Sequence, residues 1–169
     1  MKFKVYLWLI SVLPLIIACQ RQAPTSKPSS IEILEHFEGL QTIIDANHNK
    51  LLLVNFWATS CPPCIKEMPH FNRLEQEYSN KNLKILLVSL DRIKDLDSRV
   101  YPFVSKYEIL PEVAILQDQN YSAWTAKIDT SWYGALPATI LLKGEQKKFR
   151  FGAYEDYEDL EKDVKELMR

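Results

Sequence analysis

The sequence predicts an α/β protein with a central mixed β-sheet and helices on both faces. Nearly continuous apolar runs at 51–57 and 83–89 are typical of parallel strands buried on both sides. Segments with apolar residues at helical spacing alternate with these runs. A strand–turn–strand pattern and an amphipathic segment end the chain, so the second half of the sheet should be antiparallel. The 169 residues suit one domain with a sizeable core.

The first half of the domain should begin near Ile31, with a short strand at 31–34 and a helix at 39–46. The apolar strand at 51–57 comes next, followed by a helix at 62–78. The apolar residues of this helix form one stripe, made of Met68, Phe71, Leu74 and Tyr78. Pro69 lies inside the helix and is expected to kink it.

The second half should begin with a strand at 83–89, a helical segment at 95–107 and a strand at 112–116. A helix at 121–128 and two hairpin strands at 138–142 and 147–151 should follow. Pro102 should either kink the helical segment or start a shorter helix. The last segment should form an amphipathic helix, with Leu160, Val164, Leu167 and Met168 on one face.

The start of the chain, residues 1–18, is predicted to be a signal peptide. Lys2 and Lys4 precede an apolar run that is shorter than the ~20 residues a membrane-spanning helix needs. The run ends in Ile16-Ile17-Ala18-Cys19, which resembles the lipobox of bacterial lipoproteins and implies a lipid on Cys19. An ordinary secreted protein or an uncleaved anchor is the alternative. Residues 19–30 should form the lipidated N-terminus and a flexible tether, and the domain should span 31–169.

Two cysteines at the predicted start of the 62–78 helix carry the clearest chemistry. With Cys19 assigned to the lipid, Cys61 and Cys64 are the remaining thiols. A helix N-terminus favours a thiolate, and the spacing lets Cys61 attack a disulfide while Cys64 resolves the mixed disulfide. A structural disulfide or half of a zinc site is the alternative, but no cysteine follows Cys64 to complete a zinc site. We therefore expect a redox-active disulfide and no metal or other cofactor.

The charge balance argues against a nucleic-acid partner. Lys and Arg number 21 and Asp and Glu 22, so the formal net charge is −1.

Several local sequences resemble the extracytoplasmic TlpA/ResA branch of the thioredoxin family. They are residues 54–59 (VNFWAT), 65–69 (IKEMP), 134–139 (GALPAT) and 151–153 (FGA). The resemblance covers 31–169 and implies the thioredoxin fold, with 92–132 matching only loosely an insertion before the cis-proline loop. It further implies that Pro137 is cis and faces the cysteines, which leaves the Leu136 backbone free to pair with a substrate strand.

Two residues depart from what is known of thioredoxins. Ser60 stands where a tryptophan often precedes the first cysteine, and Asn55 stands where cytosolic thioredoxins bury an acid. Glu67, one helical turn after Cys64, is therefore the candidate proton carrier, with a solvated glutamate as the alternative. Trp57 is a candidate substrate wall or a plain core residue.

By resemblance, the chain should be a membrane-anchored, extracytoplasmic thiol–disulfide oxidoreductase. Its implied partners are protein disulfides, including those of apocytochrome c, and a membrane thiol transporter that supplies electrons. Gln20 after Cys19 suggests the outer-membrane side of the periplasm. Pro62 and Pro63 cannot donate an N–H to the Cys61 thiolate, which favours a reductant. The alternatives are a disulfide oxidase or isomerase, and a Cu(I) metallochaperone that uses Cys61, Cys64 and His70.

Overall fold

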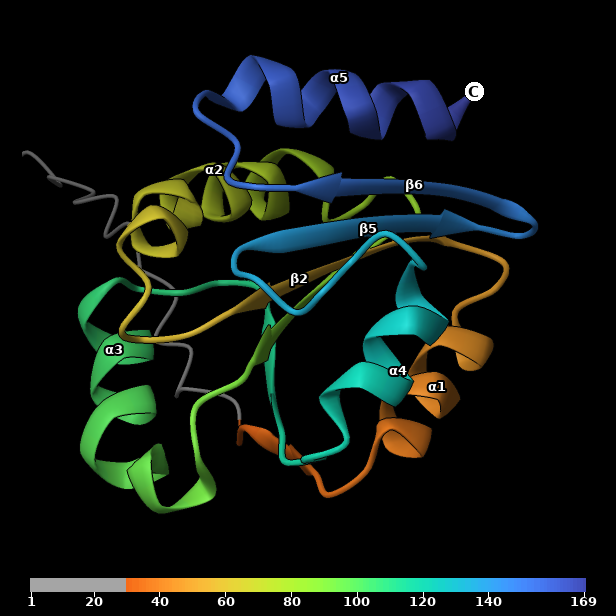
Figure 1. The fold of residues 1–169 in the computed structure, drawn as a ribbon. Helices are drawn as coiled ribbons and strands as arrows, with labels where there is room; N and C mark the ends of the chain where they lie inside the picture. Colours follow the sequence, from red (N-terminus) through yellow and green to blue (C-terminus); the bar gives the residue numbers. More distant parts are fainter. Residues whose placement is uncertain (1–29) are drawn as a thin grey trace, which may run out of the picture.

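Residues 30–169 are described by the structure, a computed structural model, and they form one mixed sheet between two layers of helices (Figure 1). The strands are β1 (Glu32–Leu34), β2 (Leu51–Trp57), β3 (Leu83–Ser89), β4 (Glu112–Leu116), β5 (Ala138–Lys143) and β6 (Gln146–Phe151). The helices are α1 (Phe37–Ala46), α2 (Pro62–Tyr78), α3 (Tyr101–Lys106), α4 (Tyr121–Ile128) and α5 (Tyr157–Met168). The predicted signal peptide, Cys19 and residues 20–29 of the predicted tether lie outside the described residues.

The six strands are ordered β1-β4-β3-β2-β5-β6. β1, β4, β3 and β2 pair in parallel, whereas β5 pairs antiparallel with both β2 and β6. β2 is therefore the central strand at which the two halves of the sheet meet, and all seven of its residues are buried. This topology confirms the predicted mixed sheet.

Each face of the sheet has its own hydrophobic core. The face under α2, α3 and α5 is packed with residues such as Leu53, Phe71, Phe103 and Leu160. The face under α1 and α4 is rich in aromatic residues. In Figure 1, α2 and α5 lie above the sheet, and α1 and α4 lie below it. The predicted helices on both faces are thus confirmed.

The predicted elements all occur, and the differences have local causes. α1 begins at Phe37, two residues before the predicted start, because Asp118 accepts a hydrogen bond from the Phe37 N–H at 3.0 Å. The hairpin loop is the two-residue Gly144-Glu145 turn, and Gly144 has φ +57°.

The segment predicted as one helix at 95–107 is not one α-helix. A 3₁₀ turn at Ile93–Asp95 and a π-helical turn at Leu96–Val100 lead into α3, where Pro102 lies in the first turn. Of the two expectations for Pro102, the start of a shorter helix is the one observed. Pro69, in contrast, lies inside α2 without ending it. Among residues 30–169, no helix is long and apolar enough to cross a membrane.

Candidate active site

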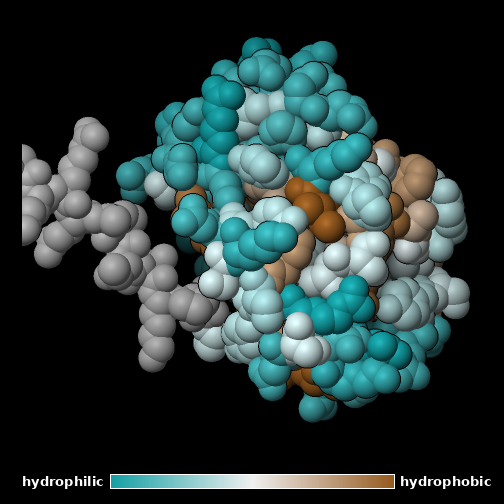
Figure 2. All heavy atoms as spheres, turned by 90° about the vertical axis from the view of Figure 1, so that its left-hand side faces the viewer, coloured by the Kyte–Doolittle hydropathy of each residue, from teal (hydrophilic) through white to brown (hydrophobic). Residues whose placement is uncertain are grey.

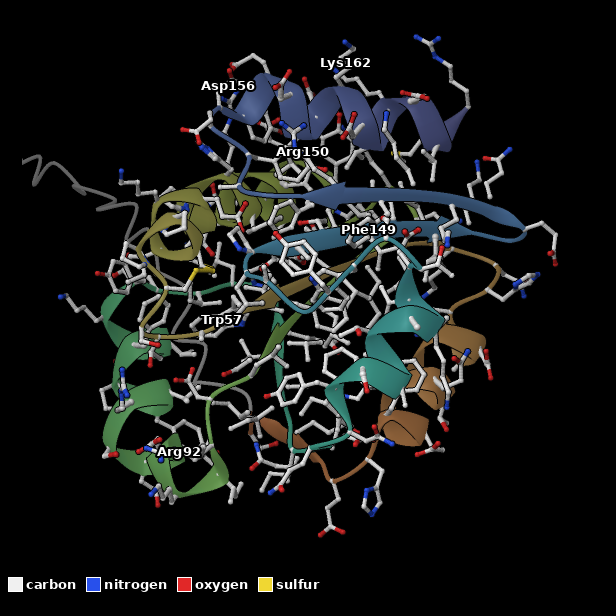
Figure 3. All side chains as sticks on the ribbon, viewed as in Figure 1. Trp57, Arg92, Phe149, Arg150, Asp156 and Lys162 are labelled. Atoms are coloured by element: carbon white, nitrogen blue, oxygen red, sulfur yellow. A yellow bond between two sulfur atoms is a disulfide. The ribbon has the colours of Figure 1, made fainter. Side chains whose placement is uncertain are left out.

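Cys61 and Cys64 form a disulfide at the start of α2, with their Cα atoms 5.3 Å apart. Figure 3 shows it as a yellow bond beside the first turn of this helix. Cys61 is the N-cap residue, and its sulfur accepts the Cys64 backbone N–H at 3.3 Å. Cys64 is completely buried, whereas Cys61 is partly exposed. An attacking group from solvent therefore meets the Cys61 sulfur first.

The loop between β2 and Cys61 is held by Asp91, a residue that the sequence analysis did not single out. The Asp91 carboxylate accepts hydrogen bonds from the Thr59 N–H at 2.8 Å and the Thr59 hydroxyl at 2.7 Å. It also accepts the Ser89 hydroxyl at 2.8 Å. The sequence signal that could have identified Asp91 is its position as an acid just after the apolar strand 83–89. The ends of neighbouring parallel strands meet at one edge of a sheet, so this acid should lie near the loop that follows strand 51–57.

The loop before β5 contains a cis Leu136–Pro137 bond, as the resemblance implied. Phe56 at the end of β2 pairs with Ala138, so Pro137 lies beside the loop that leads to Cys61. The Gly152 N–H donates to the Pro137 carbonyl at 3.0 Å. Leu136 is half-buried, and no hydrogen bond from residues 30–169 engages its backbone. Its N–H and C=O are thus available to an extended chain.

Glu67 is completely buried on α2 and is held by two donors. The Asn55 side-chain amide donates to one carboxylate oxygen at 2.9 Å, and the Tyr154 backbone N–H donates to the other at 2.9 Å. Burial raises the pKa of Glu67 to about 7, although both donors and the charge of Arg150 oppose the shift. The expected alternative, a solvated glutamate, does not match this position.

Trp57 has no exposed surface, and its ring packs against Phe103 with ring centroids 4.8 Å apart. It belongs to the same core as Cys64. A wholly buried ring presents no wall to a substrate, so this geometry favours core packing over the expected substrate contact. Its indole N–H has no hydrogen-bond partner within residues 30–169.

His70, the proposed third copper ligand, is half-buried on α2. No group of three or more His, Cys, Asp and Glu side chains in the described part of the chain is arranged to hold a metal ion.

Two exposed aromatic residues flank the cis-proline loop and were missed by the sequence analysis. Tyr133 is 77 % exposed and Phe151 is 51 % exposed, and their ring centroids are 5.4 Å apart. Phe151 pairs with Ala138, directly after Pro137. Figure 2, viewed from the side where α2 begins, shows hydrophobic side chains near the centre of this face among hydrophilic ones.

These features define a thioredoxin-fold protein with a Cys-X-X-Cys disulfide at a helix N-terminus. The model of the AhpC/TSA family matches residues 33–147, more than half of the chain, and the chain belongs to this family. It is 32% identical over 122 residues to a thiol-disulfide oxidoreductase ResA from Halalkalibacterium halodurans. A ResA from Bacillus thuringiensis is 31% identical over 115 residues.

These matches cover 71% and 68% of this chain but only 64% and 61% of the two relatives. Among solved structures, a thioredoxin-family thiol:disulfide interchange protein from Chlorobium tepidum superposes with a TM-score of 0.63 at 20% identity, covering 75% of this chain and 85% of its own. A thioredoxin-related protein from Neisseria meningitidis gives a TM-score of 0.59 at 20% identity, covering 68% and 82%. These likenesses show the thioredoxin-like fold.

Proposed function

We propose that this chain is a thiol–disulfide oxidoreductase that reduces disulfides in protein substrates. The observation that carries the proposal is the Cys61–Cys64 disulfide at the start of α2, in which Cys61 is partly exposed and Cys64 is buried. The cis-proline loop lies at the neighbouring strand end. The relatives named as thiol-disulfide oxidoreductases support the same reaction.

The cycle starts from the reduced pair. The Cys61 thiolate attacks one sulfur of a substrate disulfide, which forms a mixed disulfide and releases the first substrate thiolate. The Cys64 thiol gives its proton to the Glu67 carboxylate, and the Cys64 thiolate then attacks the Cys61 sulfur. This step releases the second substrate thiolate and leaves the Cys61–Cys64 disulfide. A dithiol donor later returns two electrons to the pair.

The substrate would lie along the cis-proline loop. The N–H and C=O of Leu136, which no residue in 30–169 engages, fit an extended segment that adds to the end of β5. The Pro137 ring limits how that segment approaches. Its disulfide would then meet the exposed sulfur of Cys61.

The direction of the cycle follows from the donors at the Cys61 sulfur. Pro62 and Pro63 have no N–H, so the Cys64 N–H is the backbone donor given to this sulfur in the described structure. A weakly stabilised thiolate makes the reduced form less stable, and the protein should therefore act as a reductant.

Turnover of a peptide disulfide, with dithiothreitol as the electron donor, tests the activity. The wild-type chain should reduce the peptide faster than background, and Cys61→Ser should return the rate to background. Equal rates with and without Cys61 would overturn the proposal. A reduction potential near that of strongly oxidising disulfide oxidases, about −120 mV, would instead favour the oxidase or isomerase alternative.

We further propose that the chain is a lipoprotein held in the periplasm through Cys19, on the outer-membrane side, and is recharged by a membrane thiol transporter. The lipobox-like sequence before Cys19 and the following Gln20 support this proposal. Cytochrome c maturation is the proposed pathway, by resemblance alone. Cys19→Ser should move the chain from the membrane fraction to the soluble one. Unchanged fractionation would contradict lipid anchoring.

No observation in the described residues favours the Cu(I) metallochaperone. Stoichiometric Cu(I) binding that is lost in His70→Ala would support the metallochaperone. Unchanged disulfide reduction by this variant would support the oxidoreductase.

A further inference from the structure

Three buried polar residues, Glu67, Asn55 and Thr139, form a hydrogen-bonded row on one face of the sheet, from α2 over β2 to β5. Asn55 on β2 lies in its middle, and Glu67, Asn55 and Thr139 are all completely buried. The Asn55 amide nitrogen donates to Glu67 Oε1 at 2.9 Å and to Thr139 Oγ1 at 3.0 Å. Asn55 and Thr139 are directly paired across β2 and β5, which fixes their side chains on the same face of the sheet.

One end of the Asn55 amide has no partner in the part of the chain that the structure describes. The buried Oδ1 atom accepts no hydrogen bond from residues 30–169. An unpaired buried acceptor costs free energy, and such a group calls for a physical reason. The amide carries a donor end and an acceptor end of nearly equal size, so a half-turn about its last side-chain bond exchanges them.

This half-turn matches the two protonation states of Glu67. When Glu67 is a carboxylate, the amide nitrogen donates to Oε1 and to the Thr139 hydroxyl oxygen, as observed. When Oε1 carries a proton, the turned amide oxygen accepts from that O–H and from the Thr139 O–H. Both states keep two hydrogen bonds in the row and leave one end of the amide unpaired. Neither state is therefore penalised by a lost bond.

We propose that Asn55 is a positioning residue whose amide turns over when Glu67 gains or loses its proton. The proposal rests on the proposed function, in which Glu67 takes the proton of the Cys64 thiol before Cys64 attacks Cys61. During that transfer the S–H bond of Cys64 breaks and an O–H bond forms on Glu67. The turned amide accepts this O–H, and Glu67 gives a proton back to the Cys64 thiolate when a dithiol donor reduces the disulfide.

The other groups around Glu67 cannot do this. The Tyr154 N–H holds Oε2 and can only donate, and the nearby charges are those of Arg150 on β6 and of Glu155. Figure 3 shows Arg150 between β6 and α5, and its guanidinium lies 4.2 Å from the Tyr154 ring centroid. From α5, Asp163 accepts the Tyr154 hydroxyl at 3.1 Å.

Within the described residues, Asn55 is thus the neighbour that bonds to Oε1 and can also reverse its polarity. The raised pKa of Glu67, about 7, is consistent with a carboxyl group that changes protonation near neutral pH.

Nuclear magnetic resonance of the oxidised full chain tests the turnover without any mutation. Between pH 5 and 9, the Glu67 carboxyl carbon and the Asn55 side-chain amide should titrate with the same midpoint. Below the midpoint the amide hydrogens should lose their contacts to the Thr139 side chain. In Glu67→Gln the amide should show no titration. Amide contacts that persist while Glu67 titrates would overturn the proposal.

Rapid-mixing kinetics of Asn55→Leu test its consequence. Asn55→Leu removes the hydrogen bond between Asn55 and Glu67 in both protonation states. The bond to the charged carboxylate is the stronger one, so the carboxylate form of Glu67 should lose more stabilisation than the protonated form. The pH of half-maximal mixed-disulfide resolution should rise, which slows this step about tenfold at pH 7. The control Thr139→Ser keeps the hydroxyl and should keep the profile.

A variant that is slower by the same factor at every pH would contradict the proton role of Asn55. A wild-type chain with no reductase activity would instead refute the proposed function, and the resonance experiment would still report on the amide.

Discussion

The two sulfurs of the Cys61–Cys64 pair are chemically alike but lie in different surroundings. Cys61 is partly exposed at a helix N-cap, whereas Cys64 is buried one turn before a buried acid. Asn55 shows how far sequence reasoning reaches at this scale. The sequence shows that this position of the buried strand carries an amide and not an acid. It does not show the hydrogen bond from Asn55 to Glu67, because this bond joins β2 to α2 and no local pattern connects them. Trp57 was ambiguous for the same reason, since exposure depends on α3 packing over it.

Replacing Glu67 with Gln should slow resolution of the mixed disulfide by at least about tenfold at pH 7 and remove its pH dependence near 7, because Gln cannot take the Cys64 proton. Rapid mixing of reduced enzyme with a peptide disulfide measures this step. Glu75→Gln, a change elsewhere on α2, should leave the profile unaltered. An unchanged profile in Glu67→Gln would exclude Glu67 as the proton carrier.

At the scale of the elements, the loops hold the parts of the site that the sequence analysis overlooked. Apolar runs, helical spacing of apolar residues and the hairpin turn located the strands and helices, except that the predicted 95–107 helix is not continuous. These patterns could not predict that Asp91 would clamp Thr59, or that Tyr133 would meet Phe151, because these contacts depend on how loops from separate elements pack. The cis Pro137 came only from the family resemblance.

The double variant Tyr133→Ala/Phe151→Ala should lower kcat/KM several-fold for peptide disulfides flanked by apolar residues. These exposed rings border the cis-proline loop, and aromatic side chains dominate contact energy at interfaces. Reduction of a small disulfide such as oxidised glutathione should be unaffected. Tyr121→Ala removes a partly exposed ring on α4 and serves as the control. Equal losses on both kinds of substrate would argue against a docking role.

Asp156 caps α5 by accepting the Asp159 N–H at 2.8 Å. Asp156→Ala should lower the free energy of unfolding by about 1 kcal/mol, because the N–H loses its partner. Urea denaturation measures the change, and Asp156→Asn should retain most of the stability. An equal loss in both variants would point to the charge rather than to the cap.

On the scale of the whole molecule, the mixed sheet places the cysteine loop and the cis-proline loop at neighbouring strand ends. β2 is buried along its whole length and pairs with β3 on one side and β5 on the other. The overall architecture was predictable because apolar strands and amphipathic helices admit few arrangements. The network around Glu67 was not, since it joins residues from α2, β2 and the segment after β6.

The buried Glu67 should also make the stability of the oxidised protein depend on pH. Its pKa is about 7 in the folded state, above the ordinary value of 4.5, so the folded state holds a proton that the unfolded state has lost between these pH values. The free energy of unfolding should therefore fall by about 3 kcal/mol as pH rises from 4.5 through 7. Urea denaturation of wild type and Glu67→Gln isolates this contribution. Parallel pH profiles would contradict the raised pKa.

Trapping of the mixed disulfide tests the central claim most directly, namely that Cys61 attacks and Cys64 resolves. Reduced Cys64→Ser, mixed with a peptide disulfide and examined by mass spectrometry, should accumulate one peptide per chain, attached to Cys61. Reduced Cys61→Ser should accumulate little, because the Cys64 sulfur is buried. Equal trapping on Cys64, or no adduct in either variant, would contradict the account.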